Sequence, residues 1–136
     1  METNKPILLV EDDQVDAMTV RRAFKDVHIT NNLEVAGNGL EALDFLQNSN
    51  NPNPCIILLD LNMPKMNGIE FLKHIKKDDN LKIIPVVVLT TSEEEQDRVD
   101  SYNLGVAGYI LKPVDYRKFL DVVKTIDLYW TLCILP

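Results

Sequence analysis

Short apolar runs alternate along the chain with segments of helical periodicity, and this alternation constrains the fold more than any other feature. The clearest runs cover residues 7–10, 55–59, 84–89 and 109–111, and a weaker run covers residues 33–36. Runs that are apolar throughout are typical of strands in a parallel sheet that is covered on both faces. The order βαβαβαβαβα therefore predicts a doubly wound, five-stranded parallel α/β sheet with helices on both faces.

The segments between the runs carry apolar residues at helical spacing on one face. Three of them begin with an Asn or Ser that is followed three residues later by Glu, which is the spacing of a capping box. These pairs are Asn38 with Glu41, Asn67 with Glu70, and Ser92 with Glu95. The apolar stripe of the last helix consists of Phe119, Val123, Ile126, Trp130 and Cys133.

Composition limits the class of protein. The 136 residues suit a single domain. Acidic residues outnumber basic ones by 21 to 14, for a net charge of −7, which disfavours binding to nucleic acid. No apolar stretch approaches the roughly 20 residues of a membrane span, so we expect a cytoplasmic protein without a membrane partner. Cys55 and Cys133 match no metal-ligand spacing and are expected to be buried, reduced thiols.

Acidic, hydroxyl and ammonium groups stand where four of the predicted strands end. The residues concerned are Glu11, Asp12 and Asp13 after the first strand, Asp60 after the third, Thr90 at the end of the fourth, and Lys112 after the fifth. In an open parallel sheet these ends share the edge where ligands bind. Crowded carboxylates repel one another unless a cation joins them, and a hard ion such as Mg²⁺ suits oxygen ligands. Taken singly, Glu11 or Asp13 could instead cap the following helix.

Asp60 differs from the other acids in its surroundings. It follows five apolar residues and precedes the sequence Leu-Asn-Met-Pro, which should hold its backbone rigidly at the mouth of the sheet. A carboxylate in such a place can attack phosphorus and form an acyl phosphate. Phosphoryl transfer otherwise requires in-line placement and neutralised oxygens, which a metal ion, Lys112 and the Thr90 hydroxyl would supply. Asp60 is therefore the predicted phosphoacceptor.

Four stretches in order, ILLVEDD, IILLDLNMPKMNG, PVVVLTTS and GYILKP, resemble the receiver domain of bacterial two-component response regulators, the CheY-like family. The resemblance covers about residues 5–127. It implies the flavodoxin-like strand order 2-1-3-4-5, a Mg²⁺ (or Mn²⁺) cofactor, and phosphorylation by a sensor histidine kinase or a phosphorelay. A receiver of this kind signals by conformational switching, dimerisation or onward phosphotransfer, and it catalyses only its own phosphorylation and dephosphorylation.

The same resemblance assigns roles to single positions of this chain. The metal ligands would be Glu11, Asp12, Asp60 and the backbone carbonyl of Asn62. Asp60 would accept the phosphoryl group with assistance from Thr90 and Lys112, and Thr90 and Tyr109 would form the switch. Taken alone, Tyr109 is better interpreted as a half-buried strand aromatic with its hydroxyl in water. The resemblance also implies a cis bond between Lys112 and Pro113, whereas sequence alone favours trans.

The C-terminal end is unusually apolar for a receiver. We expect residues 1–136 to form a single, stand-alone receiver domain in which residues 128–136 are an apolar extension of the last helix. Exposed apolar patches often mark interfaces. The apolar C-terminal end therefore predicts a homodimer that forms through the last helix and the tail. The alternative is a tail that folds back on its own domain. The loop before the third strand, residues 101–105 and the tail resemble small regulators that are paired with bacterial phytochrome kinases.

Three other classes of protein fit parts of the pattern. An aspartyl phosphohydrolase of the haloacid-dehalogenase kind would need a second Asp two residues after its nucleophile, where this chain has Asn62. A flavodoxin-like cofactor binder would need a phosphate-binding loop after the first strand, where residues 11–13 are acidic and repel phosphate. A purely structural interaction domain would be inert to phosphodonors.

Overall fold

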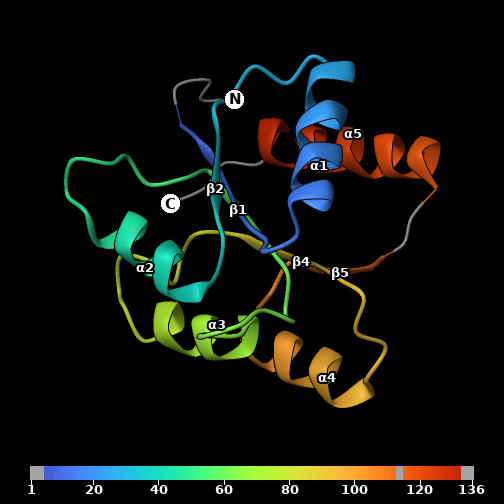
Figure 1. Cartoon of the computed structure of the whole chain (residues 1–136). Helices are drawn as coiled ribbons and strands as arrows, with labels where there is room; N and C mark the ends of the chain where they lie inside the picture. Colours follow the sequence, from blue (N-terminus) through green and yellow to red (C-terminus); the bar gives the residue numbers. More distant parts are fainter. Residues whose placement is uncertain (1–4, 113–114, 133–136) are drawn as a thin grey trace.

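One parallel sheet of five strands forms the centre of the molecule (Figure 1). The computed structural model describes residues 5–112 and 115–132. The strands are β1 (Ile7–Val10), β2 (Leu33–Ala36), β3 (Ile56–Leu59), β4 (Val86–Thr90) and β5 (Gly108–Leu111). Their order in the sheet is β2-β1-β3-β4-β5, and every neighbouring pair is parallel. This confirms the predicted fold, including the weak strand at residues 33–36.

Helices cover both faces of the sheet, as predicted. Helices α1 (Gln14–Asp26) and α5 (Tyr116–Leu132) pack together on one face (Figure 1). On the opposite face lie α2 (Gly39–Gln47), α3 (Gly68–Lys76) and α4 (Glu95–Asn103), with α3 in contact with both of its neighbours. Of the helices in the described ranges, none is both long and apolar enough to cross a membrane.

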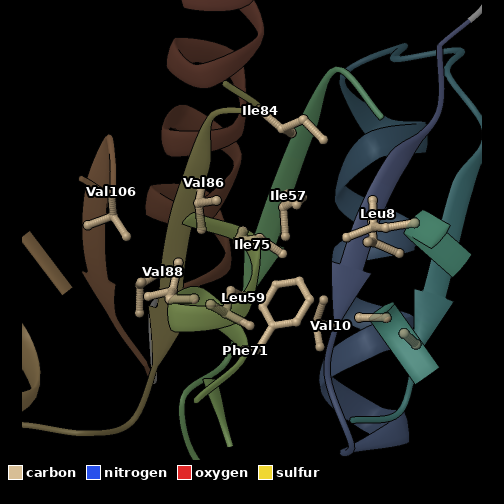
Figure 2. Packing of buried hydrophobic residues seen from close by; sticks show 14 of the residues in the cluster. Leu8, Val10, Ile57, Leu59, Phe71, Ile75, Ile84, Val86, Val88 and Val106 are labelled. Carbon is tan, nitrogen blue, oxygen red and sulfur yellow. The ribbon is translucent and has the colours of Figure 1, made fainter. Parts of the chain in front are cut away.

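The strands are apolar throughout because each face of the sheet has its own core. On the α2–α3 face, alternate strand residues pack around Phe71 and Ile75 (Figure 2). These strand residues are Leu8, Val10, Ile57, Leu59, Val86 and Val88. On the other face, the intervening strand residues pack against Phe24 of α1 and Phe119 of α5. Two covered faces hold the strands firmly, so the polar residues that follow them are fixed in position.

Two of the three predicted helix starts are confirmed. Asn67 caps α3 in a complete capping box with Glu70, and the Asn38 side chain accepts a hydrogen bond from the Glu41 backbone N–H at 3.0 Å. The third prediction is wrong, because α4 begins at Glu95 and its cap position is Glu94, whose side chain makes no capping bond. The Ser92 hydroxyl instead donates to the Asp97 carboxylate at 2.6 Å. Ser92 therefore belongs to the loop before α4.

Of the two cysteines, Cys55 lies within the described residues. Cys55 is buried, as predicted, and burial raises the pKa of its thiol, while Cys133 lies outside the described residues. The bond from Lys112 to Pro113 also falls outside them. Helix α5 continues to Leu132, beyond residue 127, and Leu128 on it is 57% exposed.

Candidate functional site at the carboxyl edge of the sheet

The register of the sheet brings the four strand ends together. Val10 is paired with Leu59 and Thr90 with Leu111, so the residues that follow these strands lie side by side at one edge. Backbone hydrogen bonds continue the alignment past the strands. The Asp60 N–H donates to the Val10 carbonyl at 3.0 Å, and the Lys112 N–H donates to the Thr90 carbonyl at 2.7 Å.

Three of the predicted metal ligands converge at this edge. Glu11, Asp12 and Asp60 each offer a carboxylate oxygen, and these oxygens all lie within 4.8 Å of one another. Glu11 and Asp60 are buried, whereas Asp12 is exposed to solvent. The arrangement therefore combines a dense negative charge with one side that is open to an incoming ion.

Asn62, the fourth predicted ligand, lies on the loop that follows Asp60. Its backbone N–H donates to the Asp60 carboxylate at 3.3 Å, which helps to orient that side chain. The loop is anchored further along, because the Gly68 N–H donates to the Leu61 carbonyl at 2.9 Å. The start of α3 therefore holds the loop that carries Asn62 in place.

Lys112 bridges several acids at once. Its ammonium group donates to Glu11 and to Asp16, at 2.7 Å each, and lies 3.8 Å from a carboxylate oxygen of Asp60. Burial lowers the pKa of Lys112, but the bonds to Asp16 and Glu11 and the charge of Asp60 outweigh it and raise this pKa above its ordinary value. Asp16, in the first turn of α1, is not singled out by the sequence patterns, since its partner is 96 residues away.

Glu11 is the acid whose charge is most costly. Its side chain is only 1% exposed, and burial together with the nearby Asp60 carboxylate raises its pKa to about 7 despite the opposing bond from Lys112. Between pH 4.5, the ordinary value, and about 7, the folded protein therefore binds more protons than the unfolded chain. The stability of the metal-free fold consequently decreases as the pH rises through this window.

Replacing this carboxyl by an amide should remove that penalty. In the presence of a chelator, we expect Glu11→Gln to have a higher urea midpoint than the wild type at a pH of about 8, and nearly the same midpoint at a pH of about 4. Glu34→Gln, an exposed change on β2, is the matched control and should not alter the pH dependence. If Glu11→Gln were the less stable protein at the higher pH, the Glu11 carboxylate would be stabilising rather than strained.

Asp13 caps helix α1 and does not belong to the carboxylate cluster. Its side chain accepts hydrogen bonds from the N–H groups of Val15 and Asp16, at 2.8 and 3.0 Å, and so caps α1. Glu11, in contrast, points into the site, where it accepts from Lys112 and from the Asp13 N–H. The capping interpretation therefore holds for Asp13 and fails for Glu11.

The two predicted switch residues are linked through Ser92. The buried Thr90 hydroxyl oxygen accepts from the Ser92 N–H at 3.3 Å, and the Tyr109 hydroxyl donates to the Ser92 carbonyl at 3.0 Å. Tyr109 is half-buried, and burial raises its pKa, whereas the Ser92 side chain has a smaller, opposing effect. Its hydroxyl is thus bonded to the loop after β4 rather than left to water.

The fold and the site together define a class. The sheet is doubly wound in the order 2-1-3-4-5, and its carboxyl edge carries clustered carboxylates, a buried threonine and an ion-paired lysine. This combination is that of a CheY-like signalling domain. The model of the family described as response regulator receiver domain matches residues 7–124. The chain therefore belongs to the response regulator receiver family, whose members are signalling proteins rather than classical enzymes.

Individual relatives place the chain more closely within this family. Response regulator Rcp1 of Synechocystis sp. is 43% identical over 135 residues, which cover 95% of this chain and 92% of Rcp1. The crystal structure of the phosphorylated cyanobacterial phytochrome response regulator RcpA matches with a TM-score of 0.88 and 38% identity, over 98% of this chain and 99% of RcpA. The Mn²⁺-bound form of Rcp1 matches with a TM-score of 0.86 and 42% identity, over 97% and 99% of the two chains.

Proposed function

We propose that Asp60 accepts a phosphoryl group from a sensor histidine kinase in a reaction that requires Mg²⁺. The observation that carries this proposal is the convergence of Glu11, Asp12 and Asp60 within 4.8 Å, beside an ammonium group that is itself 3.8 Å from Asp60. Glu11 and Asp12, with Asp60 and the backbone carbonyl of Asn62, are the proposed metal ligands.

The donor set fits a hard divalent cation. All the side chains offered are carboxylates, two of them are buried, and Lys112 supplies a single positive charge against them. Repulsion among the acids already raises the pKa of Glu11, although burial contributes more. When bound, the cation would neutralise charge on the phosphoryl oxygens. The Mn²⁺-bound form of Rcp1, a 42% identical protein, supports a cation of this type.

The chain's own residues would then perform the transfer. A carboxylate oxygen of Asp60 attacks phosphorus, the bond from phosphorus to the donor's leaving atom breaks, and the leaving group departs with the electron pair. Lys112 can turn one N–H toward the arriving phosphoryl oxygen, because only two of its three donors are used by Glu11 and Asp16. The Thr90 hydroxyl would donate to another oxygen.

The chain should turn over its phosphoryl group slowly. Two residues after Asp60 stands Asn62, which cannot protonate a leaving group as an Asp would. Self-phosphorylation and self-dephosphorylation are therefore the only chemistry that we propose, which favours a signalling receiver over a haloacid-dehalogenase type of phosphohydrolase.

The hydrogen bonds of Ser92 offer a route from the phosphoryl group to the surface. If Thr90 turns its hydroxyl toward a phosphorylated Asp60, the bond from the Ser92 N–H is lost. Ser92 also holds Tyr109 through its carbonyl and Asp97 of α4 through its hydroxyl. Within α4, Ser101 is the one buried residue, so this helix is weakly anchored and suited to move. We propose that Tyr109 and α4 respond together.

Incubation with acetyl phosphate tests the proposal. With Mg²⁺, intact mass spectrometry should show one phosphoryl group per chain, and an excess of chelator should prevent its appearance. Equal labelling with and without chelator would contradict the proposed metal dependence, and no labelling in either sample would support the inert interaction domain instead.

The relatives support the proposed type of partner. RcpA, 38% identical, is described as a cyanobacterial phytochrome response regulator, which supports a phytochrome-type histidine kinase as the phosphodonor. The phosphorylated chain would signal by switching, by dimerisation, or by passing the group onward.

We further propose that the whole chain is one receiver whose residues 128–136 extend the last helix and form a homodimer interface. Support comes from Leu128, which is 57% exposed near the end of α5. Two added charges at an apolar interface should separate the subunits, so Leu132→Asp with Ile134→Asp should elute as a monomer in gel filtration. Gln47→Asp with Asn48→Asp adds the same charge on and beside α2 and should leave the dimer intact. A monomeric wild type would contradict the interface.

A further inference from the structure

Lys112 is hydrogen-bonded to one acid inside the carboxylate cluster and to one acid outside it. Glu11 belongs to the carboxylate cluster at the sheet edge, whereas Asp16 lies outside it, on the first turn of α1. Both bind the ammonium at 2.7 Å, but the nearest Asp60 oxygen is 3.8 Å from it, beyond hydrogen-bond distance. The resting position of the ammonium is therefore set by Glu11 and Asp16, and of these two only Asp16 attracts it away from the cluster.

We propose that Asp16 is a positioning residue that holds Lys112 away from Asp60 and thereby slows phosphoryl transfer. The inference rests on the proposed phosphorylation of Asp60. Lys112 keeps one N–H for an oxygen of the incoming group, but its two bonds hold the ammonium 3.8 Å from Asp60, and the bond to Asp16 is the one outside the cluster. The negative charge of Asp16 also lies next to the ammonium that would receive that oxygen, so it repels an anionic phosphodonor.

Asp16 is held where it can exert this effect. Its backbone N–H donates to the capping side chain of Asp13 at 3.0 Å, which fixes the first turn of α1. A carboxylate in the first turn of a helix is favoured by the helix dipole. The Asp16 side chain is 39% exposed, whereas that of Lys112 is 11% exposed, so the pair is open to water on the side of the aspartate.

The surroundings leave room for this pair to change. An open pocket of about 250 Å³ lies between α1, the end of β4 and α5, and is lined by Asp16, Lys112, Thr91 and Phe119 among others. A side chain of similar size at position 16 would therefore fit without repacking the core. If the pull of Asp16 is removed, the ammonium can move toward Asp60 or toward a phosphoryl oxygen on it.

Two measurements test the inference, because it predicts faster labelling together with weaker Mg²⁺ binding. For Asp16→Asn, we expect the rate of labelling by acetyl phosphate at saturating Mg²⁺ to rise about threefold to tenfold, as one partly screened charge is removed and Lys112 is freed. The dissociation constant for Mg²⁺, measured by calorimetry without phosphodonor, should rise about threefold, because the freed ammonium competes for the carboxylates and one negative charge is gone. A change that merely loosened the fold would weaken both properties.

Matched variants separate pairing from charge and from folding. Asp16→Glu keeps a carboxylate for Lys112 and should stay close to the wild-type rate. Asp44→Asn, an exposed change on α2, alters the net charge equally and should affect neither measurement. Asp16→Ser repeats the loss of charge with a smaller side chain, in case Asp16→Asn folds poorly.

An unchanged or slower rate in both Asp16→Asn and Asp16→Ser would overturn the inference. The underlying proposal has its own signal in the same assay. If the wild type takes up no phosphoryl group, phosphorylation itself fails, and the role of Asp16 fails with it. If the wild type is labelled normally and the Asp16 variants are no faster, only the role of Asp16 is refuted.

Discussion

Asp60→Asn should take up no phosphoryl group from acetyl phosphate while the protein remains folded. The amide is nearly the same size as the carboxylate but cannot form an acyl phosphate. Asp60 is buried beside Glu11, so loss of its charge relieves repulsion and should not unfold the chain. Intact mass spectrometry after incubation with Mg²⁺ and acetyl phosphate measures the loss, and circular dichroism checks the fold.

Asp13→Asn is the matched control for this prediction. Asp13 lies two residues beyond Glu11 and caps α1, and Asn is as good a capping residue as Asp. This variant should therefore be labelled like the wild type. Labelling of Asp60→Asn, or loss of labelling in Asp13→Asn, would show that the acceptor has been placed on the wrong acid.

Gly68→Ala should cause a large loss of stability, although it replaces Gly by the best helix former at the first position of α3. A Cβ atom at residue 68 would lie 2.6 Å from the Asp60 carbonyl oxygen, 2.7 Å from Leu61 Cα and 2.8 Å from Leu61 Cδ2. Two of these atoms belong to the backbone and cannot rotate away. Overpacking costs about 1–3 kcal/mol, and the two backbone contacts place this site in the upper part of that range. This cost outweighs the gain of up to about 1 kcal/mol from helix propensity.

Urea unfolding measures this effect, and Gly108→Ala provides the comparison. At Gly108 the nearest atom to a new Cβ is a Val87 methyl at 3.8 Å, an ordinary contact, so the change there should be small. Because the clash at Gly68 involves the backbone of Asp60, the labelling rate should also fall. A Gly68→Ala protein as stable as the wild type would mean that α3 does not pack against the Asp60 loop as described.

The architecture was predictable because both faces of the sheet are covered. Strands such as β1 and β3 are buried at every position, and their continuous apolar runs are visible in the sequence. The weaker β2 is partly exposed, which explains its weaker signal. The strand order, in contrast, came from the family resemblance, since periodicity alone does not determine which strands are neighbours.

The contents of the site were predictable only in part. Residues that directly follow strands, such as Asp60 and Lys112, are marked by the strand ends, because the register of a parallel sheet fixes where these ends lie. Asp16 carries no such mark, since it lies within a helix and meets Lys112 only in the folded chain. The role of Ser92 was misjudged for a similar reason. A local spacing rule suggested a cap, but Asp97 and the backbone of the loop engage this residue instead.

Mapping the modified residue shows whether Asp60 is the phosphoacceptor. The wild type is incubated with acetyl phosphate and Mg²⁺, the acyl phosphate is trapped by reduction, and the modified residue is located by peptide sequencing in a mass spectrometer. We expect a single modified position, Asp60. Modification at Glu11, Asp12 or a histidine, with Asp60 untouched, would contradict it.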